Sequence, residues 1–139
     1  MGRLIDDADS IRALLTSARV IAVVGLSGNA HRPSNEVASY MQRHGYRVIP
    51  VNPNETEVLG EECYPNLAGV PEKIDIVDCF RKTEEIASVV DEAIAVGARC
   101  VWMQLGIADP VAAARAQAAG LDVVMNRCIK VDHAVLLRN

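Results

Sequence analysis

Apolar and polar residues alternate along the chain in a repeated pattern: an amphipathic stretch ends at a glycine, and a short apolar run follows at once. The pattern occurs at residues 43–51, 95–102 and 119–125, around Gly45, Gly97 and Gly120. Glycine carries no Cβ penalty in the left-handed conformation that commonly ends a helix. The runs that follow are short and rich in Val, so they predict β-strands.

Two further apolar runs, at residues 20–25 and 74–79, bring the predicted strands to five. Nearly continuous apolar strands are typical of a parallel sheet that helices cover on both faces. The intervening amphipathic segments predict helices at residues 7–17, 34–44, 83–96, 110–119 and 130–137. This alternation predicts an α/β fold with a doubly wound, Rossmann-like parallel sheet, because parallel strands need crossover helices.

One connection departs from that alternation. The stretch between Val51 and Ile74 contains several prolines and glycines and has no helical periodicity. We expect a long loop there, with a short strand near Val58 and Leu59.

Length, charge and cysteine spacing narrow the function. The 139 residues fit one domain that spans residues 1–139. The net charge of −4 and the lack of a Lys/Arg run argue against a nucleic-acid partner. No apolar stretch approaches the ~20 residues that span a bilayer, and the N-terminus lacks a signal-peptide pattern, so we expect a cytoplasmic protein without a membrane partner. The scattered cysteines and histidines predict free thiols and no metal site.

The first predicted strand leads into a glycine-containing loop and then into the next helix. Ligands of doubly wound sheets bind outside the carboxyl ends of the strands. The amides of Ser34, Asn35 and Glu36 at the helix start favour an anion, and Arg32 can pair with a phosphate. The structural alternative is a glycine turn followed by an ordinary Ser N-cap. We favour the phosphate interpretation, whose candidate residues are Gly25, Leu26, Ser27, Gly28, Arg32 and Ser34.

A dinucleotide such as NAD fits this loop poorly. The spacing Gly25-x-x-Gly28 is not G-x-G-x-x-G, and the second strand ends in Pro50-Val-Asn-Pro-Asn54 without the usual acidic residue. Glu55 is near but lies beyond a proline turn. These features disfavour NAD without excluding it, so an NAD(P)-binding oxidoreductase or redox sensor stays the alternative function.

Polar and aromatic residues also follow the remaining strands. An aromatic ring can pack against an adenine or a pantetheine arm, whereas exposed basic residues are usually just solvated. The candidates are Phe80, Arg81 and Lys82 after the third strand, Gln104 after the fourth, and Asn126, Arg127 and Cys128 after the fifth. Trp102 is expected in the core, and Cys128 either faces the ligand or is buried and inert. Asp75 and Asp78 bracket the third strand, and we expect both to accept hydrogen bonds from local amides.

Six motifs at these strand ends, in this order and spacing, resemble one protein family. They are Val-Gly-Leu-Ser at 24–27, Arg-Pro-Ser at 32–34, Pro-Val-Asn-Pro at 50–53, Asp-Cys-Phe-Arg at 78–81, Trp-Met-Gln-Leu-Gly at 102–106 and Asn-Arg-Cys at 126–128. From about residue 11 to residue 137 the chain resembles the stand-alone CoA-binding-domain proteins, which are related to the CoA-binding Rossmann domain of succinyl-CoA synthetase α subunits.

The resemblance implies coenzyme A as the ligand. Its nucleotide and diphosphate would lie near the loop 25–28, Arg32 and Ser34, flanked by Asn52-Pro53 and Phe80-Arg81. The pantetheine would run toward Gln104 and residues 126–128. The residues alone do not distinguish CoA from another nucleotide.

No catalytic constellation is visible. Acyl-CoA chemistry needs a nucleophile or a general base within reach of the thioester, and no Ser-His-Asp or Cys-His-Asn arrangement can be drawn. The sequence therefore favours a non-catalytic binding, carrier or sensor module for CoA or an acyl-CoA. A thiol-linked regulator, in which Cys128 forms a mixed disulfide with CoA, is a further alternative. The apolar last helix either packs against a second copy, giving a homodimer, or closes the domain's own core.

Overall fold

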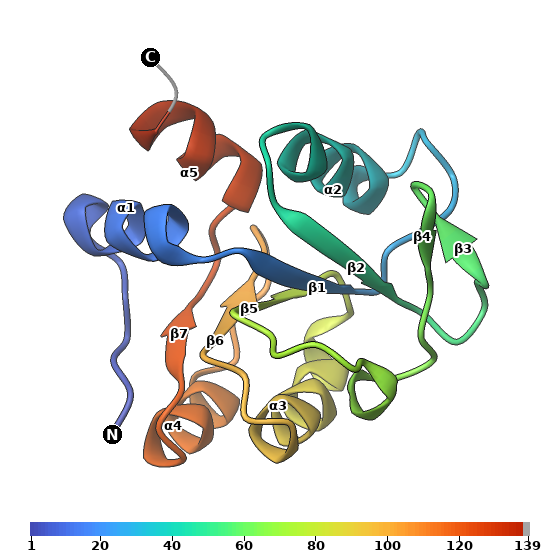
Figure 1. Cartoon of the computed structure of the whole chain (residues 1–139). Helices are drawn as coiled ribbons and strands as arrows, with labels where there is room; N and C mark the ends of the chain where they lie inside the picture. Colours follow the sequence, from blue (N-terminus) through green and yellow to red (C-terminus); the bar gives the residue numbers. More distant parts are fainter. Residues whose placement is uncertain (138–139) are drawn as a thin grey trace.

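A five-stranded parallel sheet forms the centre of the structure (Figure 1), a computed structural model that describes residues 1–137. The strand order β2-β1-β5-β6-β7 is that of a doubly wound α/β fold, as predicted. The strands are β1 (Val20–Val24), β2 (Arg47–Val51), β5 (Ile76–Cys79), β6 (Cys100–Met103) and β7 (Asp122–Val124).

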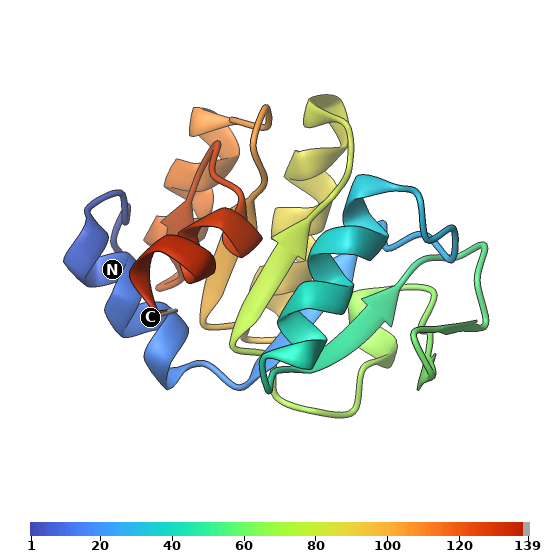
Figure 2. The same cartoon turned by 90° about the horizontal axis from the view of Figure 1, so that it is seen from above.

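Helices cover both faces of the sheet. The first, second and last helices lie on one face and the other two on the opposite face (Figures 1 and 2). Asp7 and Asp109 cap the first and fourth helices by accepting hydrogen bonds from the amides of Ser10 and Ala112. The helices are α1 (Ala8–Ser17), α2 (Pro33–Arg43), α3 (Ile86–Ala95), α4 (Pro110–Ala118) and α5 (Ile129–Leu136). The predicted helix at 83–96 differs at its start, because Thr83–Glu85 forms a separate 3₁₀ turn.

The glycine turns predicted at the helix ends are confirmed. Gly45, Gly97 and Gly120 have φ values of +94°, +70° and +95°. Trp102 is fully buried, and its indole Nε1 donates to the carbonyl of Arg127 at 2.8 Å, so its assignment to the core is also confirmed.

The connection between β2 and β5 is a loop, but it contains a hairpin rather than a single short strand. Strands β3 (Glu57–Val58) and β4 (Glu61–Glu62) pair in antiparallel fashion. Leu59 has a φ of +55° and lies in the turn between them, not in a strand. The 3₁₀ turn η1 (Leu67–Gly69) follows.

The last helix closes the domain's own core. Ile129, Asp132 and His133 are buried where α5 packs against α1 and α2. Val131 and Val135 are exposed on its outer face. A homodimer through that face stays a prediction.

The sheet reverses its winding between β1 and β5. The chain leaves β1 through α2 and returns to β2 on one side, whereas all strands after β5 lie on the other side. The loops after β1 and β5 therefore separate, and such a switch point is the usual place for a ligand in open α/β sheets.

Candidate ligand-binding site at the switch point

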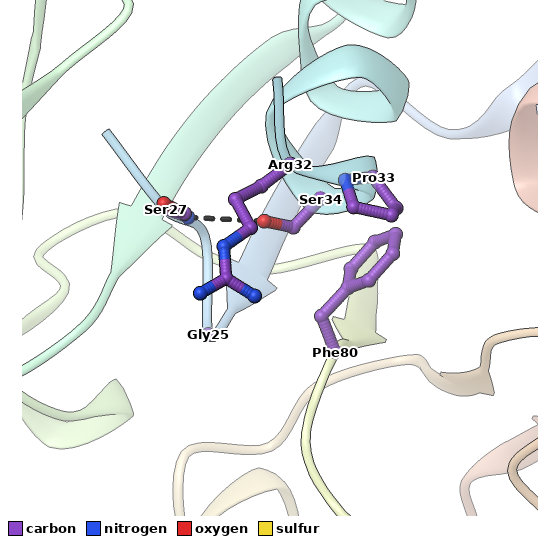
Figure 3. A pocket seen from close by; sticks show the side chains of 6 residues that line it. All are labelled: Gly25, Ser27, Arg32, Pro33, Ser34 and Phe80. Atoms are coloured by element: carbon purple, nitrogen blue, oxygen red, sulfur yellow. Dashed lines mark hydrogen bonds between the residues drawn. The ribbon is translucent and has the colours of Figure 1, made fainter. Parts of the chain in front are cut away.

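A pocket of about 320 Å³ opens between the β1–α2 loop and the end of β5 (Figure 3). Most of the residues predicted for a phosphate site surround it, and the Arg32 side chain extends between the glycine loop and the Phe80 ring. The lining residues are Gly25, Ser27, Arg32, Pro33, Ser34 and Phe80.

The first turn of the loop requires glycine. Gly25 has a φ of +90°, and a Cβ atom there would lie 2.2 Å from the carbonyl oxygen of Phe80. The glycine thus lets the loop pass close to the end of β5. Leu26 then turns its side chain fully into the core, so only its backbone is available to a ligand.

Hydrogen bonds within the loop fix its shape. The amide of Ser27 donates to Ser34 Oγ at 3.0 Å, and Asn35 Nδ2 donates to the Ser27 carbonyl at 2.8 Å. Asn52 Nδ2 donates to the Leu26 carbonyl at 3.0 Å, so Asn52 supports the loop from behind. The Ser34 hydroxyl is therefore committed to the loop rather than to its own helix.

The amino end of α2 is left without a side-chain cap. Arg32 occupies the N-cap position and Pro33 follows it, and no side chain accepts from the first turn. The Glu36 amide donates to the Arg32 carbonyl at 3.1 Å, so the prediction that this amide is available to an anion is wrong. A helix start that no side chain caps favours an anion.

The basic residues around the pocket have no acidic partners. Among residues 1–137, Arg32, Arg81 and Lys82 form no ion pair, whereas Arg47, Arg115 and Arg127 all do. Arg81 and Pro53 line a neighbouring pocket of about 270 Å³ against α3. Lys82 lies at the start of the following 3₁₀ turn and lines neither pocket.

Glu55 lies beyond a proline turn in the sequence, yet the structure brings it to the glycine loop. Its Oε2 accepts from the Gly28 amide at 2.7 Å. The proline turn folds Glu55 back toward the loop, because Asn52 accepts from the Asn54 and Glu55 amides. An Asn-Pro-Asn turn is the one signal in the sequence that could have indicated this reversal.

The residues after β6 and β7 form a separate group. Gln104 is buried, and its Oε1 accepts from the Ile129 amide at 3.1 Å. Asn126, at a φ of +58°, accepts from the Gly106 amide at 2.7 Å, and Arg127 pairs with Asp132. Each of these side chains already has a structural partner.

Cys128 belongs to that second group. It is half-buried and lines an apolar pocket of about 220 Å³ with Leu105 and Val131. Residues 126–128 therefore line a different pocket and not the wall of the switch-point pocket.

The two aspartates that bracket β5 behave differently. Asp75 Oδ2 accepts from the amides of Arg19 and Val20 at 2.8 and 2.9 Å, as predicted. The prediction for Asp78 is wrong, because neither of its carboxyl oxygens has a hydrogen-bond partner within the described chain. Its side chain is 1% exposed, and burial raises its pKa well above the ordinary range for aspartate.

Residues 1–137 show neither a metal-binding cluster nor a membrane-spanning helix. No cluster of three or more His, Cys, Asp or Glu side chains suits a metal ion there. None of the helices in this range has the length and hydropathy to cross a bilayer.

Sequence comparison connects this geometry with known proteins. The family described as "CoA binding domain" matches residues 19–134, from just before β1 into α5. This chain belongs to the CoA-binding-domain family. The resemblance derived from the strand-end motifs is thereby confirmed.

The chain is also similar to proteins from bacteria and archaea. The uncharacterized protein YneT of Bacillus subtilis is 39% identical over 125 residues, which cover 90% of this chain and 93% of YneT. A hypothetical protein from Pyrococcus horikoshii has a solved structure with 41% identity and a TM-score of 0.92, covering 99% of this chain and 98% of that one. Acetate–CoA ligase (ADP-forming) I of Archaeoglobus fulgidus is 28% identical over 74 residues, which cover 53% of this chain but 11% of the ligase.

Proposed function

We propose that the protein binds coenzyme A, or an acyl-CoA, in the pocket at the switch point. The observation that carries this proposal is the unpaired Arg32 guanidinium beside the uncapped start of α2. Together they offer a positive side chain and the positive end of a helix to one anion. Membership of the CoA-binding-domain family and the similarity to an acetate–CoA ligase support CoA as the molecule that carries the anion.

Each part of CoA can be assigned residues that it would contact. The diphosphate lies against Arg32, and the Phe80 ring packs on the adenine or the start of the pantetheine arm. From β1 to β7 the sheet edge spans three strand spacings, roughly 14 Å, which an extended pantetheine arm can follow. Its thiol end then approaches Cys128 and the apolar pocket with Leu105 and Val131.

The site suits binding rather than catalysis. The hydroxyls nearest the anion belong to Ser27 and Ser34, and both already accept hydrogen bonds from loop amides. No His or Cys lines the pocket to act as a base or nucleophile. The protein acts as a carrier or sensor of CoA.

A second candidate function rests on Glu55. A carboxylate at the end of the second strand is the group that holds ribose hydroxyls in NAD-binding domains. Glu55 reaches the glycine loop through Gly28, so an NAD(P)-binding sensor or oxidoreductase is the alternative to test.

Calorimetric titration with CoA, acetyl-CoA, NADH, NADPH and ATP at one stated salt concentration separates the candidates. We expect CoA or acetyl-CoA to bind, and Arg32→Ala to weaken binding about tenfold or more, because a charge-assisted contact to phosphate is lost. Arg43→Ala is the matched control, since Arg43 is exposed at the opposite end of the same helix. Binding of NADH or NADPH without any response to CoA would overturn the proposal.

A further inference from the structure

Asp78 occupies an unusual position in the sheet. Its neighbours on β5, Val77 and Cys79, point into the core layer under α3 and α4. Asp78 therefore points to the opposite layer, between its register partners Val23 and Trp102, both of which are buried there. A carboxyl group thus takes a place that its neighbours fill with apolar side chains.

That position lies on the strand that leads to the pocket wall. Phe80 follows Asp78 by two residues and so lies on the same face of the sheet. Phe80 packs against the same core layer and forms one wall of the switch-point pocket. The carboxyl of Asp78 is consequently one step deeper than the Phe80 ring along the same strand.

An unpartnered buried carboxyl is rare in native proteins and destabilises them. Neither carboxyl oxygen of Asp78 has a hydrogen-bond donor among residues 1–137. By contrast, Asp75, which immediately precedes the same strand, accepts two hydrogen bonds. Groups that weaken a fold and lie next to a pocket are often kept for binding.

We propose that Asp78 forms the floor of the ligand site and accepts a hydrogen bond from an N–H group of the bound molecule once the Phe80 ring moves aside. This inference rests on the proposed function. CoA carries such N–H groups in the two amides of its pantetheine arm and in the amino group of its adenine. Asp78 is then a binding residue that the free protein keeps covered.

The decisive variant is Asp78→Val, because valine has the shape of the neighbouring Val23 and needs no hydrogen bond. We expect the free variant to resist urea better than the wild type, and its affinity for CoA to fall about tenfold or more. Asp78→Asn keeps an acceptor oxygen and should recover most of the affinity. Asp75→Ala is the control, since it removes a structural acceptor at the opposite end of the strand and should leave CoA affinity unchanged.

The outcomes separate this inference from the proposed function. Failure of the wild type to bind CoA overturns the proposed function and the inference with it. CoA binding that is equal in the wild type and in Asp78→Val overturns the inference alone. An Asp78→Val protein that is less stable than the wild type, or that fails to fold, also overturns it, because the carboxyl then stabilises the free protein.

Two fragments of the ligand identify the N–H donor. Pantetheine carries the amides without the adenine, and adenosine 3′,5′-bisphosphate carries the adenine without the amides. The loss of affinity in Asp78→Val should appear with one fragment and not with the other. No loss with either fragment would contradict the proposed hydrogen bond.

Discussion

For single residues at the switch point, local sequence patterns predict some positions in the site and not others. Phe80 follows β5 directly and Arg32 ends the loop between β1 and α2, so strand and helix prediction places both at the carboxyl edge of the sheet, where they line one pocket. Glu55 could not be placed, because its position depends on a turn that reverses the chain after Asn52. Asp78 could not be interpreted either, since a single aspartate in an apolar strand gives no sign of whether a donor lies opposite.

At the scale of single residues, replacing Glu55 tests whether its negative charge weakens the binding of an anion at the β1–α2 loop. Glu55→Gln keeps an acceptor for the Gly28 amide and removes a negative charge beside the proposed phosphates. We expect CoA affinity to rise roughly threefold to fivefold, the size of a screened surface interaction. The control is Glu57→Gln, whose side chain is exposed on β3. Calorimetry measures both, and weaker NADH binding by Glu55→Gln would instead favour the NAD-binding alternative.

The pH dependence of stability tests Asp78. Its raised pKa in the folded state means that the native protein holds this proton more tightly than the unfolded chain does. The free energy of unfolding therefore falls as the pH rises above the pKa of this aspartate in the unfolded chain, which is about 3.9. The fall is up to about 1.4 kcal/mol per pH unit and continues until the pH reaches the pKa in the folded state. Asp78→Asn cannot ionise and should lose this slope in urea titrations between pH 4 and pH 8. Identical slopes in both proteins would contradict the burial of an uncompensated carboxyl.

At the scale of elements, the helices and strands were predictable because each carries its own signal. The helix-ending glycines and the apolar runs lie in the sequence where the structure has them. Of the β3–β4 hairpin, only a short strand near Val58 was predicted; the second strand was missed, since Glu57–Val58 and Glu61–Glu62 are too short to show alternation. The separate pockets were missed as well, because the sequence does not show which strand-end side chains are engaged by partners such as Asp132.

The glycine that begins the β1–α2 loop offers a matched comparison. Gly25→Ala adds a Cβ that meets the Phe80 carbonyl at 2.2 Å, whereas Gly45, with a similar φ of +94°, has nothing within 4 Å of the added atom. Gly45→Ala should cost about 1–2 kcal/mol through backbone conformation alone. Gly25→Ala should cost clearly more, since the end of β5 must also shift. Urea unfolding of both variants measures the difference, and equal losses would show that the loop does not depend on that close approach.

At the scale of the whole molecule, the proposed anion site lies where the sheet reverses, and elements from distant parts of the chain surround it. A ligand that contacts the β1–α2 loop and β5 together stabilises the native state. At about a hundredfold excess over the dissociation constant, CoA should add about 2.7 kcal/mol to the free energy of unfolding and raise Tm by roughly 10 °C. Differential scanning calorimetry measures this rise, which should shrink in 1 M salt because the phosphate contacts are screened.

The contact between Glu55 and the Gly28 amide affects which molecules can bind at the β1–α2 loop. A tethered carboxylate competes with any incoming anion at a high effective concentration, set by the short chain that holds it. We expect a singly charged metabolite to gain too little from Arg32 to displace that internal competitor. A polyphosphate that engages Arg32 and the helix start at once should gain enough, so we expect the loop to select for ligands of high negative charge.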